Sequence, residues 1–387
     1  MRLRLLVTAV AVMAVVVTAA GVLVAVRVAS VRPSARASPT TSSSEAPSPT
    51  VALTPGPAGR PVVYVYYYMW WTPQHWQSKL GPKYPLNGPR LVAPGSTNAQ
   101  GCNPTTKYPG ATIVDLPQVG LYNQNLASTY ETQISQAAQA GVTGFLASWQ
   151  GTGTAHQSAV SSGYDQRLAL LVHAVNLYNQ VHPTAPFYLG LAFSAFGDYT
   201  RPASQIEADL TYFSRTYGRN PAFRNSYSSN PIVVVMDSRK YSLSTVSGIW
   251  NTEHASAYLV GDETSQSWAR DQPYLDATSY YWSSEDPWTN TAARSDLISL
   301  GKQVRAAGKR WFAPFIPGYN KQLLGGSCVP RDGVATMAKL WSINAASGPQ
   351  GWFGISWNEF VENTYLQPSL NYGSTYLREL KLLIEGT

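Results

Sequence analysis

Eight short apolar runs, rich in β-branched and aromatic residues, alternate with polar segments from residue 62 to residue 357. Runs of this length and composition predict buried β-strands. The predicted strands cover residues 62–71, 144–150, 187–195, 232–237, 257–261, 277–282, 310–316 and 352–357.

Helical patterns lie between these runs. Leu168, Leu171 and Val175 share one face of a helix that we expect to start near Asp165. In the next helix Ser204 and Glu207 have the spacing of a capping box. Further helices are predicted over residues 291–307, 334–346 and 374–384. Eight strands that alternate with helices predict an α/β fold, a (β/α)8 TIM barrel.

The N-terminal region has a different pattern. Residues 5–26 are uncharged and almost wholly aliphatic, and Arg2, Arg4 and Arg27 flank them. This run is longer than a signal-peptide core and close to the ~20 residues of a membrane span. We therefore expect residues 1–27 to be a signal anchor, with a cleaved signal peptide as the alternative. Both place the chain outside the cell, either anchored to the surface membrane or secreted.

Residues 28–60 are rich in Ser, Thr, Pro and Ala without an apolar period, which predicts a disordered linker. The folded domain is then expected over residues 61–387. Most of the net charge of +7 comes from the region before it, because residues 1–60 hold six of the 28 basic and one of the 21 acidic residues. The remaining 22 basic and 20 acidic residues leave the folded part nearly neutral. Nucleic acid is therefore not an expected partner.

Polar and aromatic side chains gather where the predicted strands end. The active site of a barrel lies at the C-terminal ends of its strands, aromatic rings stack on sugar rings, and polar groups bind hydroxyls. Tyr64 and Tyr66 are expected in the core. The expected substrate contacts are Tyr67, Tyr68, Trp70, Trp71, His75, Trp149, Gln150, Asp237, Tyr281, Tyr319, Asn320 and Asn358.

The candidate catalytic residues are Glu359 and Glu362, within residues 351–368, where an apolar strand turns abruptly polar. Two carboxyl groups are the minimum apparatus for glycoside hydrolysis. The alternative is a strand followed by a helix N-terminus, where acidic side chains favour the helix dipole; Pro368 and the missing apolar period weaken it. A long segment, 72–123, follows the first strand and is expected to build or cover the cleft.

Other chemistries lack their motifs. The chain has no GxSxG elbow, no GxGxxG or Walker A loop and no metal-binding spacing, so we expect no cofactor and no metal. Cys102 and Cys328 are the two cysteines. In an exported protein they are candidates for a disulfide, with two free thiols as the alternative.

Five blocks of the sequence resemble glycoside hydrolase family 99 and its relatives, which include endo-α-mannosidases. They are VYYYMWW followed by His75 and Trp76, AGVTGFLASWQG, YGRNPAFRNSYSSNPIVVVMDS, PGYN and SWNEFVENTYLQPSLNYGSTYL. The last is the most specific, because the family pattern is close to NEWHEGTQIEP. The residues that match it are Asn358, Glu359, Glu362, Thr364 and Pro368.

The resemblance implies a metal-independent (β/α)8 hydrolase that retains anomeric configuration. It implies that Glu359 acts as base on the sugar 2-hydroxyl and that Glu362 acts as general acid and then base. The departures at Phe360, Val361, Asn363, Tyr365 and Gln367 predict a changed sugar preference. An α-1,3-glucanase-like hydrolase is therefore an alternative. So are a non-hydrolytic protein that binds or assembles surface polysaccharide and a structural wall-associated protein. Oligomeric state, linkage, and endo or exo action stay open.

Overall fold

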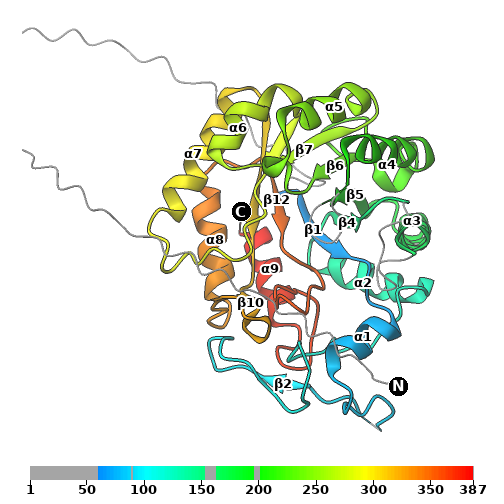
Figure 1. Ribbon diagram of the computed structural model, residues 1–387, viewed down its shortest axis with the longest axis vertical. Helices are drawn as coiled ribbons and strands as arrows, with labels where there is room; N and C mark the ends of the chain where they lie inside the picture. The colour runs from blue at the N-terminus through cyan, green and yellow to red at the C-terminus, as the bar shows by residue number, and fades with distance from the viewer. Residues whose placement is uncertain (1–59, 89, 153–162, 196–200, 387) are drawn as a thin grey trace, which may run out of the picture. The chain divides into compact units, whose positions relative to one another are not determined.

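Eight parallel strands close a barrel in the computed structural model, which describes residues 60–386 except 89, 153–162 and 196–200 (Figure 1). Around the barrel the strands follow the order β1-β12-β9-β8-β7-β6-β5-β4. This confirms the (β/α)8 barrel predicted from the sequence. The strands are β1 (Val63–Tyr68), β4 (Gly144–Trp149), β5 (Tyr188–Phe193), β6 (Ile232–Val235), β7 (Tyr258–Asp262), β8 (Ala277–Ser279), β9 (Arg310–Phe315) and β12 (Gly351–Gly354).

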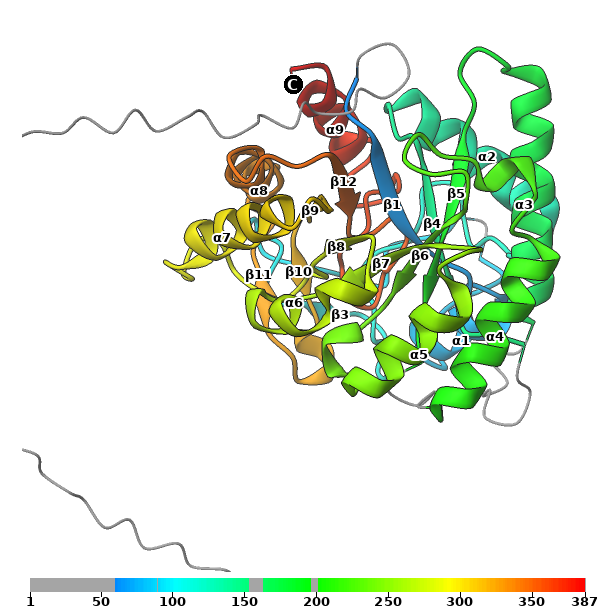
Figure 2. The same ribbon diagram turned by 90° about the horizontal axis from the view of Figure 1, so that it is seen from above.

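Helices surround the strands, as Figure 2 shows from above. Each covers the outer face of the barrel with its apolar side; α3, for example, buries Leu168, Leu171 and Val175. The helices are α2 (Ala127–Gln139), α3 (Tyr164–Val181), α4 (Ala203–Thr216), α5 (Leu243–Glu253), α6 (Ser265–Asp271), α7 (Ala293–Ala306), α8 (Ala335–Ala345) and α9 (Thr375–Glu385), with short 3-10 turns at Pro221–Phe223, Ser238–Lys240, Gln272–Tyr274 and Gln322–Leu324.

Alternate residues of β1 face opposite sides of the barrel wall, as the two-residue period of a strand requires. Tyr64 and Tyr66 belong to the interior cluster, in which Phe312 and Phe353 stack with their centroids 4.5 Å apart. Tyr67 faces outward and belongs to the larger cluster between the strands and the helices. This alternation decides which side chains of β1 can reach a site at the end of the barrel.

Two details of the predicted elements are wrong. Seven of the eight strands end earlier than expected; β8, for example, stops at Ser279 instead of continuing to residue 282, whereas β7 extends one residue further, to Asp262. Of the aromatic residues that follow β8, Tyr281 lines the cavity at the strand ends and Trp282 packs into the core. The capping box at Ser204 and Glu207 is absent, since α4 begins after Pro202 without a side-chain cap.

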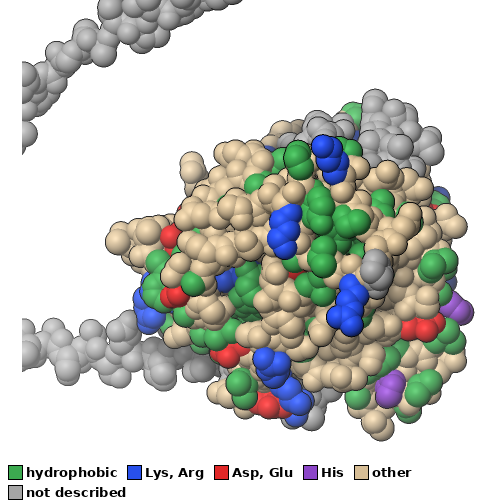
Figure 3. Space-filling view, turned by 90° about the horizontal axis from the view of Figure 1, so that it is seen from below, with side chains coloured by type: hydrophobic (Ala, Val, Ile, Leu, Met, Phe, Trp, Pro, Cys, Tyr) green, Lys and Arg blue, Asp and Glu red, His purple; other side chains and the backbone are tan. Residues whose placement is uncertain are grey.

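The segment that follows β1 contains α1 (Pro73–Leu80), β2 (Gly95–Ser96) and β3 (Thr105–Thr106), and β10 (Tyr319–Asn320) pairs with β11 (Cys328–Val329) after β9. In Figure 1 these elements lie below the barrel, on the side of the C-terminal strand ends. Figure 3 shows this side, where hydrophobic side chains gather near the middle between separate Lys and Arg side chains. The insertion therefore covers part of the end where the site is expected.

Cys102 and Cys328 form a disulfide, one of the two states that the sequence left open. The bond joins the segment after β1 to β11. Asn320 strengthens the same connection, because its side-chain amide donates to the Gly101 carbonyl at 2.8 Å. Two long loops at the C-terminal end of the barrel are thereby held together.

The predicted signal anchor and linker cover residues 1–60, of which residues 1–59 lie outside the described residues. Among the residues that are described, no helix has the length and apolar character needed to span a membrane. Arg60, where the described chain begins, lies 3.9 Å from Glu385 of α9. Because Arg60 precedes β1, the described chain starts at the end of the barrel opposite the C-terminal strand ends.

Candidate active site

The segment after β12 is held against the end of β1 by Asn358. The Asn358 amide oxygen accepts from the Tyr68 backbone N–H at 2.9 Å, and its amide nitrogen donates to the Tyr68 carbonyl at 2.9 Å. The Trp71 indole N–H donates to the Asn358 carbonyl at 2.7 Å. Both polar ends of the Asn358 amide are thus used inside the protein. This contact explains why an amide directly precedes the catalytic candidate Glu359.

Glu359 is nearly inaccessible, with 3% of its surface exposed. One carboxylate oxygen accepts from the backbone N–H groups of Val361, at 2.8 Å, and Glu362, at 3.3 Å. Burial, and then the nearby charge of Glu362, raise the pKa of Glu359 to about 8. In the free chain Glu359 therefore carries a proton at neutral pH.

Glu362 has a different environment. Its carboxylate is partly exposed and forms an ion pair with the Lys321 ammonium at 3.1 Å. The Asn320 backbone N–H donates to the Glu362 carbonyl at 2.7 Å, which fixes the main chain next to Lys321. The two carboxyl groups thus differ in burial and in charge partners, which is the arrangement that separates acid from base.

A cavity of ≈ 280 Å³ lies at the C-terminal strand ends and contains both glutamates. The Tyr68 and Tyr281 hydroxyls meet at 2.5 Å across it, and the Trp70 ring stacks on Tyr68 with centroids 4.4 Å apart. Rings beside carboxylates suit a sugar, whose C–H face packs on an aromatic face. The lining residues are Tyr66, Tyr68, Trp70, Ser148, Gln150, Ala192, Ser194, Met236, Asp237, Asp262, Tyr281, Glu359 and Glu362.

Asp262 organises the wall of the cavity opposite the glutamates. It is buried, and its carboxylate accepts from the backbone N–H groups of Asp237, at 2.9 Å, and Tyr281, at 2.8 Å. Arg239 forms ion pairs with both Asp262 and Asp237. These contacts tie the ends of β6, β7 and β8 together, so the lining side chains keep their positions when the cavity is filled.

Several expected substrate contacts do not line this cavity. Tyr67 and Trp149 face outward into the core and are fully buried, because they occupy the alternate positions of their strands. Trp71 stacks on Trp76 with centroids 3.9 Å apart, and His75 packs beside Trp71. The expected contacts that do not line this cavity are Tyr67, Trp71, His75, Trp149, Tyr319, Asn320 and Asn358.

Other residues reach the cavity without having been expected there. Tyr66 was assigned to the core, and it does belong to the interior cluster, but it also lines the cavity. The two-residue period of β1 would have predicted this position, since Tyr66 lies on the same face of the strand as Tyr68, which was expected at the site. Asp262 follows the fifth predicted strand directly, which was a usable signal. No feature of the sequence indicated that Ser148, Ala192, Ser194 and Met236 line the cavity.

No protein-family model matches the chain, and no curated protein sequence matches it. Solved structures do match. A GH99 endo-alpha-mannosidase from Bacteroides thetaiotaomicron, in complex with BIS-TRIS-propane, superposes with a TM-score of 0.63 at 16% identity, over 84% of this chain and 96% of that one. A second structure of the enzyme from this organism gives 0.63 at 17% identity with the same coverage. A protein described as glycoside hydrolase-like gives 0.58 at 13% identity, over 88% and 97%.

This chain has the fold of these glycoside hydrolases. The (β/α)8 fold that the resemblance to family 99 implied is therefore the fold that this chain shares with these structures. Because one barrel fold hosts many activities, the chemistry has to be argued from the cavity and not from the superposition.

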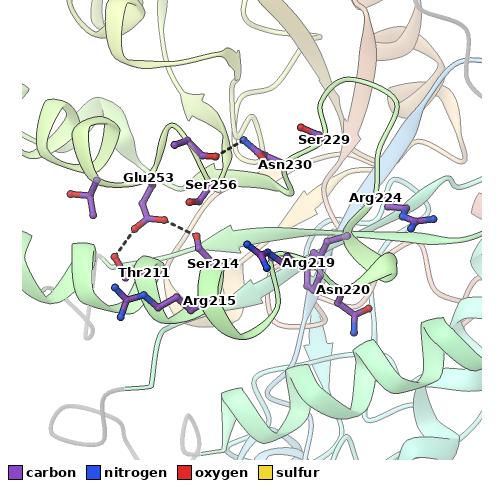
Figure 4. A pocket seen from close by; sticks show the side chains of 14 residues that line it. Thr211, Ser214, Arg215, Arg219, Asn220, Arg224, Ser229, Asn230, Glu253 and Ser256 are labelled. Atoms are coloured by element: carbon purple, nitrogen blue, oxygen red, sulfur yellow. Dashed lines mark hydrogen bonds between the residues drawn. The ribbon is translucent and has the colours of Figure 1, made fainter.

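A second cavity lies elsewhere, between α4, α5 and the segment before β6, with a volume of ≈ 860 Å³ (Figure 4). Glu253 is buried in its wall and accepts from the Thr211 and Ser214 hydroxyls, each at 2.6 Å. Figure 4 shows Arg215 and Arg224 pointing in different directions. The cavity lies where helices lead into the strand starts, the end of a barrel associated with stability, so we do not assign catalysis to it.

No group of His, Cys, Asp or Glu side chains in the described part of the chain is arranged to hold a metal ion. The four carboxylates of the candidate active site are instead paired with Arg239 and Lys321 or hydrogen-bonded to backbone N–H groups.

Proposed function

We propose that this chain is a glycoside hydrolase that cleaves α-linked polysaccharide, in the manner of an endo-α-mannosidase. The observation that carries the proposal is the placement of Glu359 and Glu362 in one cavity at the C-terminal strand ends, beside Tyr68, Trp70 and Tyr281. A carboxyl pair supplies the acid and the base of glycoside hydrolysis. The fold shared with endo-α-mannosidase structures supports the same reading.

The roles of the pair follow from the sequence resemblance. Glu359 removes the proton of the sugar 2-hydroxyl, and that oxygen attacks the anomeric carbon to form a 1,2-anhydro sugar. Glu362 donates a proton to the departing glycosidic oxygen. Water then opens the anhydro ring with Glu362 as base, while the 2-oxygen regains a proton from Glu359. Two inversions at one carbon retain the anomeric configuration.

The position of the chain ends supports a surface location. Arg60 and Glu385 lie together at the end of the barrel opposite the candidate active site. We propose that residues 1–59 tether the domain to the cell-surface membrane, so that the catalytic end can face outward toward polysaccharide.

A panel of glycans tests the proposed activity. We expect the full chain to release oligosaccharides from an α-mannan or an α-1,3-glucan, and we expect NMR of the first product formed to show the anomer of the substrate. Binding to a glycan without any cleavage would favour the non-hydrolytic alternative. An inverted first product would contradict the roles given to Glu359 and Glu362.

The pH dependence of kcat/KM tests which glutamate is the base. Glu359 must lose its proton to act as base, so we expect kcat/KM to rise with pH toward its pKa of about 8. Lys321→Met removes the cation beside the pair and should move this rising limb to higher pH, because Lys321 lowers the pKa of Glu359. Lys321→Arg keeps the cation and should leave the limb in place. A limb that falls with pH through this range would instead make Glu359 the acid.

A further inference from the structure

Trp288 differs from the other tryptophans of the chain. Its side chain is 45% exposed, whereas the other eleven are buried or only partly exposed. Large aromatic side chains are seldom this exposed to solvent, and exposed Trp and Tyr residues are enriched at binding sites. Trp288 lies in the segment between β8 and α7, seven positions after Tyr281 of the candidate active site.

The exposed ring is held in one orientation. Its indole N–H donates to the buried Thr336 hydroxyl at 2.7 Å, and the Lys339 ammonium lies 4.1 Å from the ring centroid. The Asp286 carboxylate accepts from the Trp288 backbone N–H at 2.9 Å and from the Thr289 hydroxyl at 3.1 Å. A ligand that packs on this ring therefore does not have to order it first, which favours binding.

A cavity of ≈ 450 Å³ adjoins the ring, between the start of α7 and the side of α8. Its lining contains two cations, Arg294 and Lys339, and no acidic side chain. Neither cation forms an ion pair with any residue that the structure describes. Asn290 and Ser342 add polar groups at the wall. The cavity thus combines an aromatic surface, hydroxyl-binding groups and positive charge.

The candidate active site has a different balance of charge. Four carboxyl groups line it, from Asp237, Asp262, Glu359 and Glu362, and the neighbouring Arg239 and Lys321 pair with three of them. The cations there are already paired with carboxylates, so an anionic sugar is attracted more strongly to Arg294 and Lys339 beside Trp288. The two cavities are therefore suited to different glycans.

We propose that Trp288, Arg294 and Lys339 form a second glycan-binding site, specific for polysaccharide that contains uronic acid. A sugar ring packs against the indole, and its carboxylate lies between the guanidinium of Arg294 and the ammonium of Lys339, both of which bind carboxylates well. This site would hold the enzyme on an acidic polymer while the neutral substrate enters the active site. The proposal concerns binding and does not depend on the proposed hydrolysis.

Binding of the full chain to polygalacturonate tests the site, measured by isothermal titration at low and high salt. We expect binding to polygalacturonate that weakens with salt, and little binding to the fully methyl-esterified polymer, which has the same rings without the charge. Trp288→Ala and Arg294→Gln should each weaken binding at least tenfold. Lys302→Gln, which removes an exposed cation of the same helix away from the cavity, should not.

The outcomes separate the proposal from its alternatives. Equal binding of the charged and esterified polymers, or no loss in Trp288→Ala, would overturn it. Binding that Lys302→Gln reduces as much as Arg294→Gln would show general attraction to polyanions and would also overturn it. Unchanged thermal melting of Trp288→Ala excludes unfolding as the cause of a loss, and Trp288→Phe, which keeps a ring, should retain more binding than Trp288→Ala.

Discussion

Glu359→Gln and Glu362→Gln are each expected to lower kcat for glycan cleavage by about 10²–10⁴-fold, the usual contribution of a general acid or base. Gln keeps the size of the side chain and its hydrogen-bonding oxygen, but it cannot exchange a proton at neutral pH. The measurement is the initial rate of oligosaccharide release at saturating substrate. Full activity in both variants would refute the site.

An activated substrate separates the two roles. A glycosyl fluoride leaves without a proton, so the variant that lacks the general acid should regain cleavage of the fluoride, whereas the variant that lacks the base should not. We expect rescue of Glu362→Gln and none of Glu359→Gln. Glu253→Gln changes a buried carboxylate at the C-terminal end of α5, outside the active site, and should cleave both substrates like the wild type.

Thermal melting shows whether a loss of activity comes from unfolding. Folding raises the pKa of Glu359 from 4.5 to about 8, so the folded chain binds this proton more tightly than the unfolded chain. The free energy of unfolding contributed by this group therefore falls as the pH rises between these values. Gln carries no charge at any of these pH values, so Glu359→Gln should melt no lower than the wild type at pH 8.

Arg331→Met is expected to lower the free energy of unfolding by about 2–4 kcal/mol, because a buried guanidinium has both hydrogen-bonding and aromatic partners. Its guanidinium donates to the carbonyls of Asn363, at 2.9 Å, and Tyr365, at 3.0 Å. It also lies 4.6, 4.6 and 4.3 Å from the ring centroids of Tyr365, Tyr372 and Tyr376. No carboxylate pairs with it among the described residues, so the rings and carbonyls are its stabilising partners.

The loss should appear in both stability and activity. Asn363 directly follows Glu362, so the loop that carries the catalytic pair is expected to loosen when Arg331 is removed. Arg331→Lys keeps the charge with fewer donors and should fall between the wild type and Arg331→Met. Arg378→Met removes an exposed arginine of α9 and should change stability by less than about 0.5 kcal/mol. Denaturant unfolding that ranks Arg331→Met with Arg378→Met would contradict the proposed role of Arg331.

Most strands and several helices could be predicted from the sequence, because the hydrophobic period of a strand or helix is a local property of the chain. Each of the eight barrel strands lies within or beside a predicted apolar run, and α3, α7, α8 and α9 match predicted helices to within two residues. The ends of the strands were harder to predict. Tyr280 to Trp282 have the composition of a strand, but they lie beyond the end of β8, where they line cavities and fill the core.

The sequence by itself determined the barrel and the candidate carboxyl pair, because both the periodicity and the block around Glu359 depend only on residues that are close together in the sequence. Only the tertiary structure decided which aromatic rings meet that pair. The side of the barrel wall that a ring faces depends on strand register, so Tyr66 and Tyr68 reach the cavity while Tyr67 packs against the helices. It also decided the charges around the pair, since Lys321 comes within 3.1 Å of Glu362 through chain folding over 41 positions.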